Sequence, residues 1–311
     1  MRADLFKYLR YRFGDYFINI SATLMIPVFR CLPPKLLVSI SKFIGTMVFY
    51  LFGKYRKRVI QNLTIAFGKE KDVHMIERLA KDVFFHFTLT PLETAYAYIN
   101  PFERYLLKIK IKGKENLDAA LAQGKGVIAL GAHFGPFTLL GGRLALEGYP
   151  FNLIINQEHF TKLMKRLDDY QKRIGQNPFS SKPVLSSLKK SINCLHRNEI
   201  LYLIADEQQR RGGLPVPFFG RPAYTAPGPA ILSLKTDAPI LPMFIVRENG
   251  FPKTLEIRSP IEIERTSDEK RDIERLTAQF TKAIEEIVRQ YPSQWAWLNR
   301  RWKSSYQKGD R

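Results

Sequence analysis

The chain has 311 residues, of which 45% are hydrophobic and 25% are charged, a composition that excludes an intrinsically disordered protein. Lys and Arg number 49 against 29 Asp and Glu, giving a formal net charge of +20 at pH 7. Such a charge favours an anionic partner: a membrane surface, an acidic protein or substrate, or a nucleic acid. The two cysteines show no C-x-x-C spacing and the five histidines no H-E-x-x-H spacing, so we expect neither a disulfide framework nor a bound metal.

The N-terminal region combines apolar segments with basic residues. Residues 16–29 carry no charge and residues 36–52 carry only Lys42, and each segment is shorter than the roughly 20 apolar residues of a spanning helix. Apolar helices flanked by cations are typical of the headgroup region of an anionic leaflet. We therefore predict that residues 1–60 are helices that attach the protein to a membrane. Two core helices of a soluble domain, or one tilted span in the first segment, remain alternatives.

The rest of the chain, residues 61–311, alternates helical and extended patterns. Apolar residues at helical spacing predict a long amphipathic helix over residues 73–98, and the alternating residues 107–112 predict a strand with a basic face. Further strands are expected at 127–130, 151–155, 201–205, 240–246 and 253–257, and further helices at 115–122, 186–196, 229–236 and 271–289. This order predicts an α/β domain with a mostly parallel central sheet flanked by helices.

A histidine follows the apolar strand at residues 127–130. His133 stands where that strand ends and the next helix begins, which is where open α/β sheets place their chemistry. Because imidazole titrates near neutral pH, His133 could accept a proton from an attacking hydroxyl and pass it to a leaving group. A histidine with a structural role fits this pattern equally well.

Acidic and aromatic residues follow the strand at residues 201–205. Asp206 and Glu207 come directly after it, and Arg210 and the block Phe218-Phe219-Gly220-Arg221 lie in the loop beyond. These residues could form the rim of a site for an anionic, partly apolar substrate. The alternative is a solvated charged loop over a phenylalanine core.

Three blocks carry a family resemblance: HFGPFTLL from His133, DEQQRRGGLPVPFFGRPAYTAPGPAILSLKTDAPILP from Asp206, and YPSQWAWLNRRWK near the C-terminus. In this order, and with RKRVIQNLTIAFG nearer the N-terminus, the sequence resembles the lipid A biosynthesis acyltransferases over nearly its whole length. These enzymes are the late lauroyl and myristoyl branch of the lysophospholipid acyltransferase superfamily. The FFGRPA block and the W-x-W-x-x-R-R-W ending are more specific than the histidine.

The resemblance implies a membrane-associated enzyme on the cytoplasmic face of the inner membrane. It would move a fatty acyl chain from acyl carrier protein or acyl-coenzyme A to a hydroxyl of a lipid A-type glycolipid. A glycerophospholipid or aminolipid acceptor is the alternative. The acyl thioester is a co-substrate, and no resident cofactor is expected. Anionic membrane lipid is an expected partner and nucleic acid is not, because the cations cluster with apolar helices; the oligomeric state is not predicted.

The family motif is a histidine, four residues, and an acid that orients and charges the histidine. His133 matches the base, but Thr138 stands at the position of the acid and supplies no negative charge. Three interpretations follow: Glu207 or Asp206 supplies the charge, a neutral His–Thr pair works slowly or on an easier acceptor, or the chain only binds lipid. We favour the first, because a parallel sheet can bring neighbouring strand ends together.

The resemblance also suggests substrate contacts. Backbone amides from Phe134 to Thr138 would stabilise the oxyanion, and arginines would grip a phosphate or phosphopantetheine. The tryptophans near the C-terminus are expected to pack that segment or seat it at the membrane interface. The residues expected to bind substrate are Phe134, Gly135, Arg173, Arg210, Phe218, Phe219, Gly220 and Arg221.

Overall fold

A computed structural model describes residues 29–100, 102–155, 171–209 and 211–302, together with Pro27 and Asp169. Most of the first apolar segment, residues 16–29, and Arg210 therefore lie outside the described residues.

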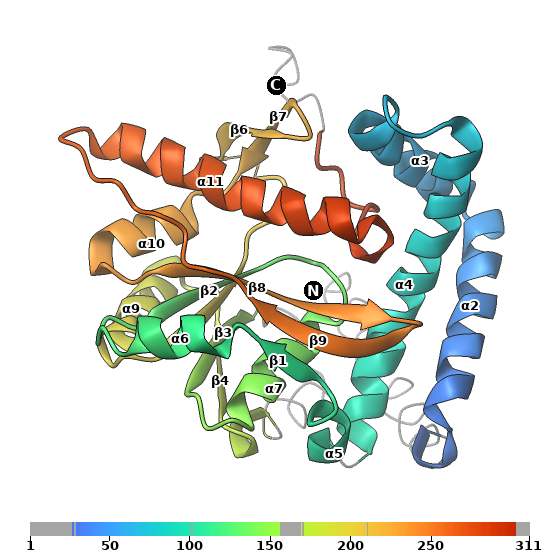
Figure 1. Ribbon diagram of the computed structural model, residues 1–311, viewed down its shortest axis with the longest axis horizontal. Coiled ribbons are helices and arrows are strands. Elements are labelled where there is room, and N and C mark those ends of the chain that lie inside the picture. The colour runs from blue at the N-terminus through green and yellow to red at the C-terminus, as the bar shows by residue number, and fades with distance from the viewer. Residues whose placement is uncertain are drawn as a thin grey trace, which may run out of the picture.

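The described part of the chain forms a seven-stranded central sheet in the order β1-β9-β8-β2-β5-β3-β4 (Figure 1). All neighbouring strands in this sheet run parallel except the hairpin pair β8 and β9. The mostly parallel α/β fold predicted from the sequence is thus confirmed. The strands are β1 (Lys110–Lys112), β2 (Val127–Gly131), β3 (Phe151–Ile155), β4 (Gln176–Ser180), β5 (Ile200–Ile204), β8 (Ile240–Glu248) and β9 (Phe251–Ile257).

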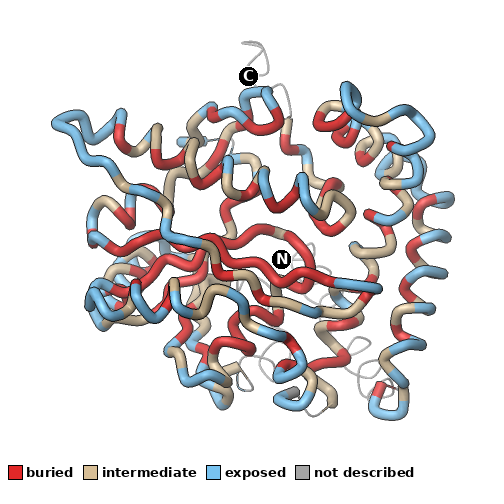
Figure 2. Tube along the Cα trace, in the orientation of Figure 1, coloured by how far each residue is buried: buried red, intermediate tan, exposed pale blue. Residues whose placement is uncertain are grey.

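Helices cover both faces of the sheet, with α11 over one face and α6 over the other (Figure 1). Because successive strand residues point to opposite faces, Ile128 and Leu130 of β2 pack in one buried cluster and Val127 and Ala129 in the other. Strand β2 is buried on both sides, as Figure 2 shows for the centre of the sheet. The helices that flank the sheet are α6 (Lys114–Leu121), α7 (Leu140–Ala145), α9 (Val184–His196), α10 (Gly228–Thr236) and α11 (Glu269–Gln290).

The N-terminal helices form a separate group beside the sheet: α2 (Pro34–Leu51), α3 (Gly53–Phe67), α4 (Val73–Ile99) and the short α5 (Phe102–Leu106). Helix α2 lies along α4 (Figure 1), and their backbones approach closely, since a Cβ on Gly45 would stand 2.8 Å from the Cα of Phe85. The predicted boundary between residues 60 and 61 falls inside α3, where Val59 and Leu63 are both fully buried in one core cluster.

Helix α2 exposes an apolar face on the side away from α4. Its exposed large side chains are Leu36, Phe43, Met47, Tyr50 and Leu51, and they recur at helical spacing. By length and composition this helix could cross a membrane, although helices of soluble proteins can meet the same criteria. The apolar helix predicted for this region is confirmed.

The sequence did not predict the helices α3 and α5, the strand β4, or the antiparallel hairpin of β6 (Leu214–Phe218) and β7 (Arg221–Thr225). The sequence of the hairpin predicts a loop because it contains Pro215, Pro217 and Pro222, and proline argues against a strand inside a sheet. Proline is tolerated in edge strands. A two-stranded ribbon has only edges. Its turn uses Phe219 and Gly220, which both adopt a positive φ, 50° and 70°, as a two-residue hairpin turn of type I′ requires.

Candidate active site

The sheet brings the ends of two distant segments together. Strands β2 and β5 are parallel neighbours, with Gly131 in register with Ile204. His133 and Asp206 each follow two residues later, so they emerge at the same carboxyl edge of the sheet. This is where ligand sites lie in open α/β folds.

His133 is held by the carboxylate of Asp206. Its Nδ1 lies 2.9 Å from Oδ1 of Asp206, and its backbone N–H donates a 2.9 Å hydrogen bond to Oδ2. On the other side of the ring, Nε2 lies 3.9 Å from Oε1 of Glu207. The Asp206 side chain is fully buried, whereas 29% of the His133 side chain and 63% of the Glu207 side chain are exposed. The ring is therefore fixed from inside and open to a substrate from outside.

The C-terminal segment fixes this arrangement from a third direction. The indole N–H of Trp295 donates a 2.7 Å hydrogen bond to Oδ2 of Asp206. Backbone bonds join the same segment to the loop after β2: the Gly135 N–H donates to the Gln294 carbonyl at 2.8 Å, and the Ala296 N–H to the His133 carbonyl at 3.0 Å. The histidine loop is thus held between β5 and a segment about 160 residues further along the chain.

The electrostatics favour an ion pair between His133 and Asp206. Burial lowers the pKa of His133, but the hydrogen bond to Asp206 and the charges of Asp206 and Glu207 outweigh it, so the pKa lies above its ordinary value of 6.5. Burial raises the pKa of Asp206, but its hydrogen bonds with His133 and Trp295 outweigh burial and hold that pKa below 3.8. An ionised Asp206 can only accept, so Nδ1 carries the proton when the imidazole is neutral, and Nε2 presents its lone pair to the open side.

Thr138 does not take the place of a motif acid beside the histidine. It lies in the 3₁₀ turn η1 (Phe137–Leu139), and its hydroxyl makes a 2.6 Å hydrogen bond with the hydroxyl of Thr94 on α4. The Phe137 ring instead packs edge-on against the imidazole, with ring centroids 5.1 Å apart. In the described part of the chain, the carboxylate that contacts Nδ1 of His133 belongs to Asp206. This agrees with the interpretation that Asp206 or Glu207 supplies the charge in place of the motif acid.

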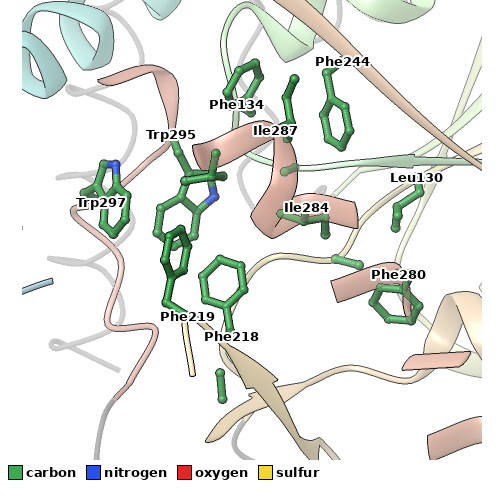
Figure 3. Close-up of a cluster of buried hydrophobic side chains, with 14 of the residues drawn as sticks. Leu130, Phe134, Phe218, Phe219, Phe244, Phe280, Ile284, Ile287, Trp295 and Trp297 are labelled. Carbon is green, nitrogen blue, oxygen red and sulfur yellow. The ribbon is translucent and has the colours of Figure 1, made fainter. Parts of the chain in front are cut away.

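The aromatic residues predicted to bind substrate lie in the core. Phe134, Phe218 and Phe219 are 1%, 1% and 6% exposed. Figure 3 shows them in a cluster with Trp295 and Trp297, and the Phe218 ring centroid lies 5.4 Å from that of Trp295. Their side chains support the site from within and do not present a surface to a substrate, so the phenylalanine core considered as the alternative is what the structure shows.

Gly135 also has a structural role. Its φ is +55°, and a Cβ at this position would stand 2.2 Å from the Ile245 carbonyl oxygen. The loop after β2 can therefore lie against β8 only because residue 135 has no side chain.

The predicted basic contacts are not gathered at the histidine. Arg173 lies just before the amino end of β4, and in a parallel sheet that is the edge opposite the one where His133 emerges. Gly220 and Arg221 are exposed at the turn of the β6–β7 hairpin. Arg210 lies outside the described residues. Within the described ranges, no three His, Cys, Asp or Glu side chains gather as metal ligands would.

Two residues at the site were not predicted to act there: Trp295 and Arg301. Arg301 is 1% exposed, and its guanidinium donates to the Glu207 carbonyl at 3.3 Å and to the Thr225 hydroxyl at 2.6 Å. It thereby ties the β6–β7 hairpin to the segment that carries Glu207. The W-x-W-x-x-R-R-W ending was the sequence feature that could have pointed to these two residues. Its spacing alone could not show that this segment folds back onto the residues that follow β5.

Comparisons with known proteins match this chain to acyltransferases. The profile described as bacterial lipid A biosynthesis acyltransferase matches residues 5–304. The chain is 24% identical over 274 residues to the lipid A biosynthesis palmitoleoyltransferase of Escherichia coli, with 84% of each chain covered. It is 32% identical over 136 residues to the phosphatidylinositol mannoside acyltransferase of Mycobacterium tuberculosis, with 42% of each chain covered.

The match over nearly the whole chain defines the class of protein as an O-acyltransferase. The chain belongs to the bacterial lipid A biosynthesis acyltransferase family, as the sequence blocks around His133, Asp206 and Trp295 had indicated.

Proposed function

We propose that this protein transfers a fatty acyl chain from an acyl thioester to a hydroxyl group of a lipid A-type glycolipid, with His133 as the general base. The observation that carries the proposal is the contact of His133 Nδ1 with Oδ1 of the buried Asp206, at 2.9 Å. The relatives named as acting on lipid A and on phosphatidylinositol mannoside support a glycolipid acceptor.

The chemistry proceeds through the open nitrogen of the ring. Nε2 of His133 takes the proton of the acceptor hydroxyl while its oxygen attacks the thioester carbonyl carbon. The C–S bond then breaks, the thiolate leaves, and the proton on Nε2 passes to the sulfur. Asp206 holds the imidazole in the tautomer that carries its proton on Nδ1. It also stabilises the imidazolium that forms between these steps, as the acid of a catalytic triad does. Glu207, 3.9 Å from Nε2, adds negative charge on the open side.

The oxyanion of the tetrahedral intermediate needs backbone donors. Of the amides between Phe134 and Thr138, that of Phe134 donates to Ala132 and that of Gly135 to Gln294, while Pro136 has no N–H. The N–H groups of Phe137 and Thr138 open η1 and donate to no other described residue. We therefore assign the oxyanion to these two amides, which narrows the range expected from the sequence.

Membrane attachment and the acyl donor complete the proposal. The exposed apolar face of α2 and the net charge of +20 support attachment to the cytoplasmic face of the inner membrane. The same charge would attract an acidic acyl carrier protein or the phosphates of acyl-coenzyme A. The thioester is a co-substrate, and the steps above draw on side chains and backbone of this chain alone.

The decisive test is acyl transfer by the purified full-length chain in mixed micelles, followed by mass spectrometry of the lipids. Acyl carrier protein and coenzyme A donors are each offered with a glycolipid and with a glycerophospholipid acceptor. The proposal requires a gain of one acyl chain on the glycolipid and a loss of about 10³-fold or more in rate for His133→Ala. Transfer only to the glycerophospholipid would show that the acceptor is a glycerophospholipid and not a glycolipid. Lipid binding without any transfer would identify a catalytically silent relative.

A further inference from the structure

A cavity of about 720 Å³ lies between helix α3 and the C-terminal segment, apart from the groups that hold His133. Its walls come from two sequence blocks, RKRVIQNL on α3 and LNRRW near the C-terminus. The lining residues of these blocks take no part in the proposed acyl-transfer chemistry. Its lining residues are Lys54, Lys57, Arg58, Ile60, Gln61, Asn62, Thr64, Ile65, Arg300 and Trp302.

The cavity is strongly cationic. Four of its lining residues are Lys or Arg and none is acidic. Lys54, Lys57 and Arg300 are exposed, and among the described residues no carboxylate lies within ion-pair distance of any of the three. Three unneutralised cations at the mouth of one pocket favour a multiply charged or phosphate-bearing ligand.

The walls are fixed by hydrogen bonds between the two segments. The buried Asn62 amide donates to the Trp297 carbonyl at 2.7 Å and to the Asn299 carbonyl at 2.8 Å. The Arg58 guanidinium donates to the Leu298 carbonyl at 3.1 Å. The pocket is therefore formed before any ligand binds, which limits the entropy lost on binding.

The surroundings of the pocket favour a lipid. Ile60, Ile65 and Trp302 give it apolar walls beside the cations. The junction of α2 and α3 exposes Leu51, Phe52 and Tyr55, which continue the apolar face of α2 up to the mouth of the pocket. Aromatic and basic residues in this order are typical of the boundary between headgroups and acyl chains.

We propose that this pocket binds the phosphate headgroup of an anionic lipid in the membrane to which α2 attaches. The cations would contact the phosphate and the apolar walls would contact the adjoining glycerol and upper acyl chain. Asn299, whose carbonyl accepts a hydrogen bond from the lining residue Asn62, also donates a 3.4 Å hydrogen bond to Glu207 beside His133. If acyl transfer occurs as proposed above, these bonds connect the pocket wall to the residue beside His133; the binding itself does not depend on that activity.

The test measures binding of short-chain lipids to the full-length protein. Titrations by calorimetry use dihexanoyl phosphatidylglycerol, dihexanoyl phosphatidylcholine and inorganic phosphate. We expect saturable binding of the first, and weak or no binding of the other two. The variant Lys57→Gln with Arg300→Gln should weaken that binding at least about tenfold, since each cation near an anionic lipid surface raises the affinity about fivefold.

The matched control is Lys110→Gln with Lys112→Gln, which removes the same charge from the exposed face of β1. It should change the affinity less than about twofold. Gln61→Trp fills the pocket without changing its charge and should also weaken binding, which separates a built site from diffuse attraction. His133→Ala should bind normally, so that failure of acyl transfer and failure of lipid binding can be told apart.

Several outcomes would overturn the proposal. Equal losses in both double variants would mean that the charge acts at long range and not at this pocket. Undiminished binding by the pocket variant or by Gln61→Trp would place the lipid elsewhere. If the pocket variant Lys57→Gln with Arg300→Gln lost binding to an acidic acyl carrier protein but kept lipid binding, the pocket would be assigned to the carrier protein instead.

Discussion

The indole of Trp295 and the carboxylate of Asp206 are joined by a 2.7 Å hydrogen bond that fixes which carboxylate oxygen faces His133. Oδ2 accepts from this indole and from the His133 backbone, which leaves Oδ1 for the imidazole. A fully buried carboxylate is costly unless it is paired and hydrogen-bonded, and these three donors meet that requirement. The C-terminal segment is therefore a part of the candidate site and does more than cover the core.

Replacing Asp206 by Asn should abolish most of the catalytic rate. The amide matches the shape of the carboxylate but carries no charge, so it neither stabilises the imidazolium nor fixes the Nδ1 tautomer. We expect kcat to fall about 10³- to 10⁴-fold with a much smaller change in KM. The control is Glu207→Gln, which removes an exposed charge 3.9 Å from Nε2 and should cost about tenfold. A larger loss in kcat for Glu207→Gln than for Asp206→Asn would show that Glu207, and not Asp206, is the acid that supports His133.

Trp295→Phe, compared with Trp302→Phe, should separate the orientation of Asp206 from packing. Phenylalanine keeps an aromatic ring but loses the pyrrole half of the indole together with its N–H to Asp206, so we expect kcat to fall about tenfold with KM unchanged. The free energy of unfolding should fall by at least about 1.5–3 kcal/mol, the usual contribution of a hydrogen bond to a charged group, because the smaller ring also loses buried contacts. Trp302→Phe deletes a comparable N–H, which donates to the neutral Phe218 carbonyl at 3.2 Å, and should leave kcat unchanged. Equal effects of the two variants on kcat would argue against a positioning role for Trp295.

Thr138→Val tests whether the hydroxyl at the position of the motif acid takes part in catalysis. Since this hydroxyl bonds to Thr94, we expect kcat to remain within about threefold of wild type and stability to fall by about 1 kcal/mol. Thr94→Val breaks this hydrogen bond and also the 2.7 Å bond that the Thr94 hydroxyl donates to the Thr90 carbonyl, so it should lower stability at least as much, again with kcat within about threefold. A loss of several orders of magnitude in kcat for Thr138→Val alone would place Thr138 in the proton path.

A buried ion pair joins β8 to α4 behind the site. The Arg247 guanidinium on β8 lies 2.6 Å from the Glu93 carboxylate on α4, with both side chains at most 1% exposed. Arg247→Met leaves a buried charge unpaired and should lower the free energy of unfolding by about 3–5 kcal/mol. Lys253→Met breaks the Lys253–Glu248 pair, in which both side chains are about half exposed, and should cost at most about 1 kcal/mol. Chemical denaturation measures both; similar values would contradict the account.

The fold could be read from the sequence to the extent that hydrophobic period and chain order determine it. Strand β3 (Phe151–Ile155) and helix α4 agree with prediction to within a residue, because their patterns are long or sharply bounded. The β6–β7 hairpin was missed because its prolines suggested a loop, and β4 because its residues QNPFS show no apolar period.

The site was predictable where it depends on strand order and unpredictable where it depends on tertiary contacts. A parallel sheet implied that His133 and the acids after β5 could meet, and they do. Nothing in the local pattern showed that Phe134 and Phe218 turn inward, that Arg173 lies toward the opposite edge of the sheet, or that Trp295 donates to Asp206. Each of these depends on packing between segments far apart in the chain.

The pH dependence of kcat/KM tests the central claim, that Asp206 makes His133 the general base. Only the neutral imidazole can accept a proton, so kcat/KM should fall as the pH drops through a pKa above 6.5, the direction in which Asp206 and Glu207 move it. In Asp206→Asn the hydrogen bond and charge are lost while burial remains, so the acid limb should move to lower pH on a much lower plateau. An acid limb at the same pH in both proteins would contradict the account.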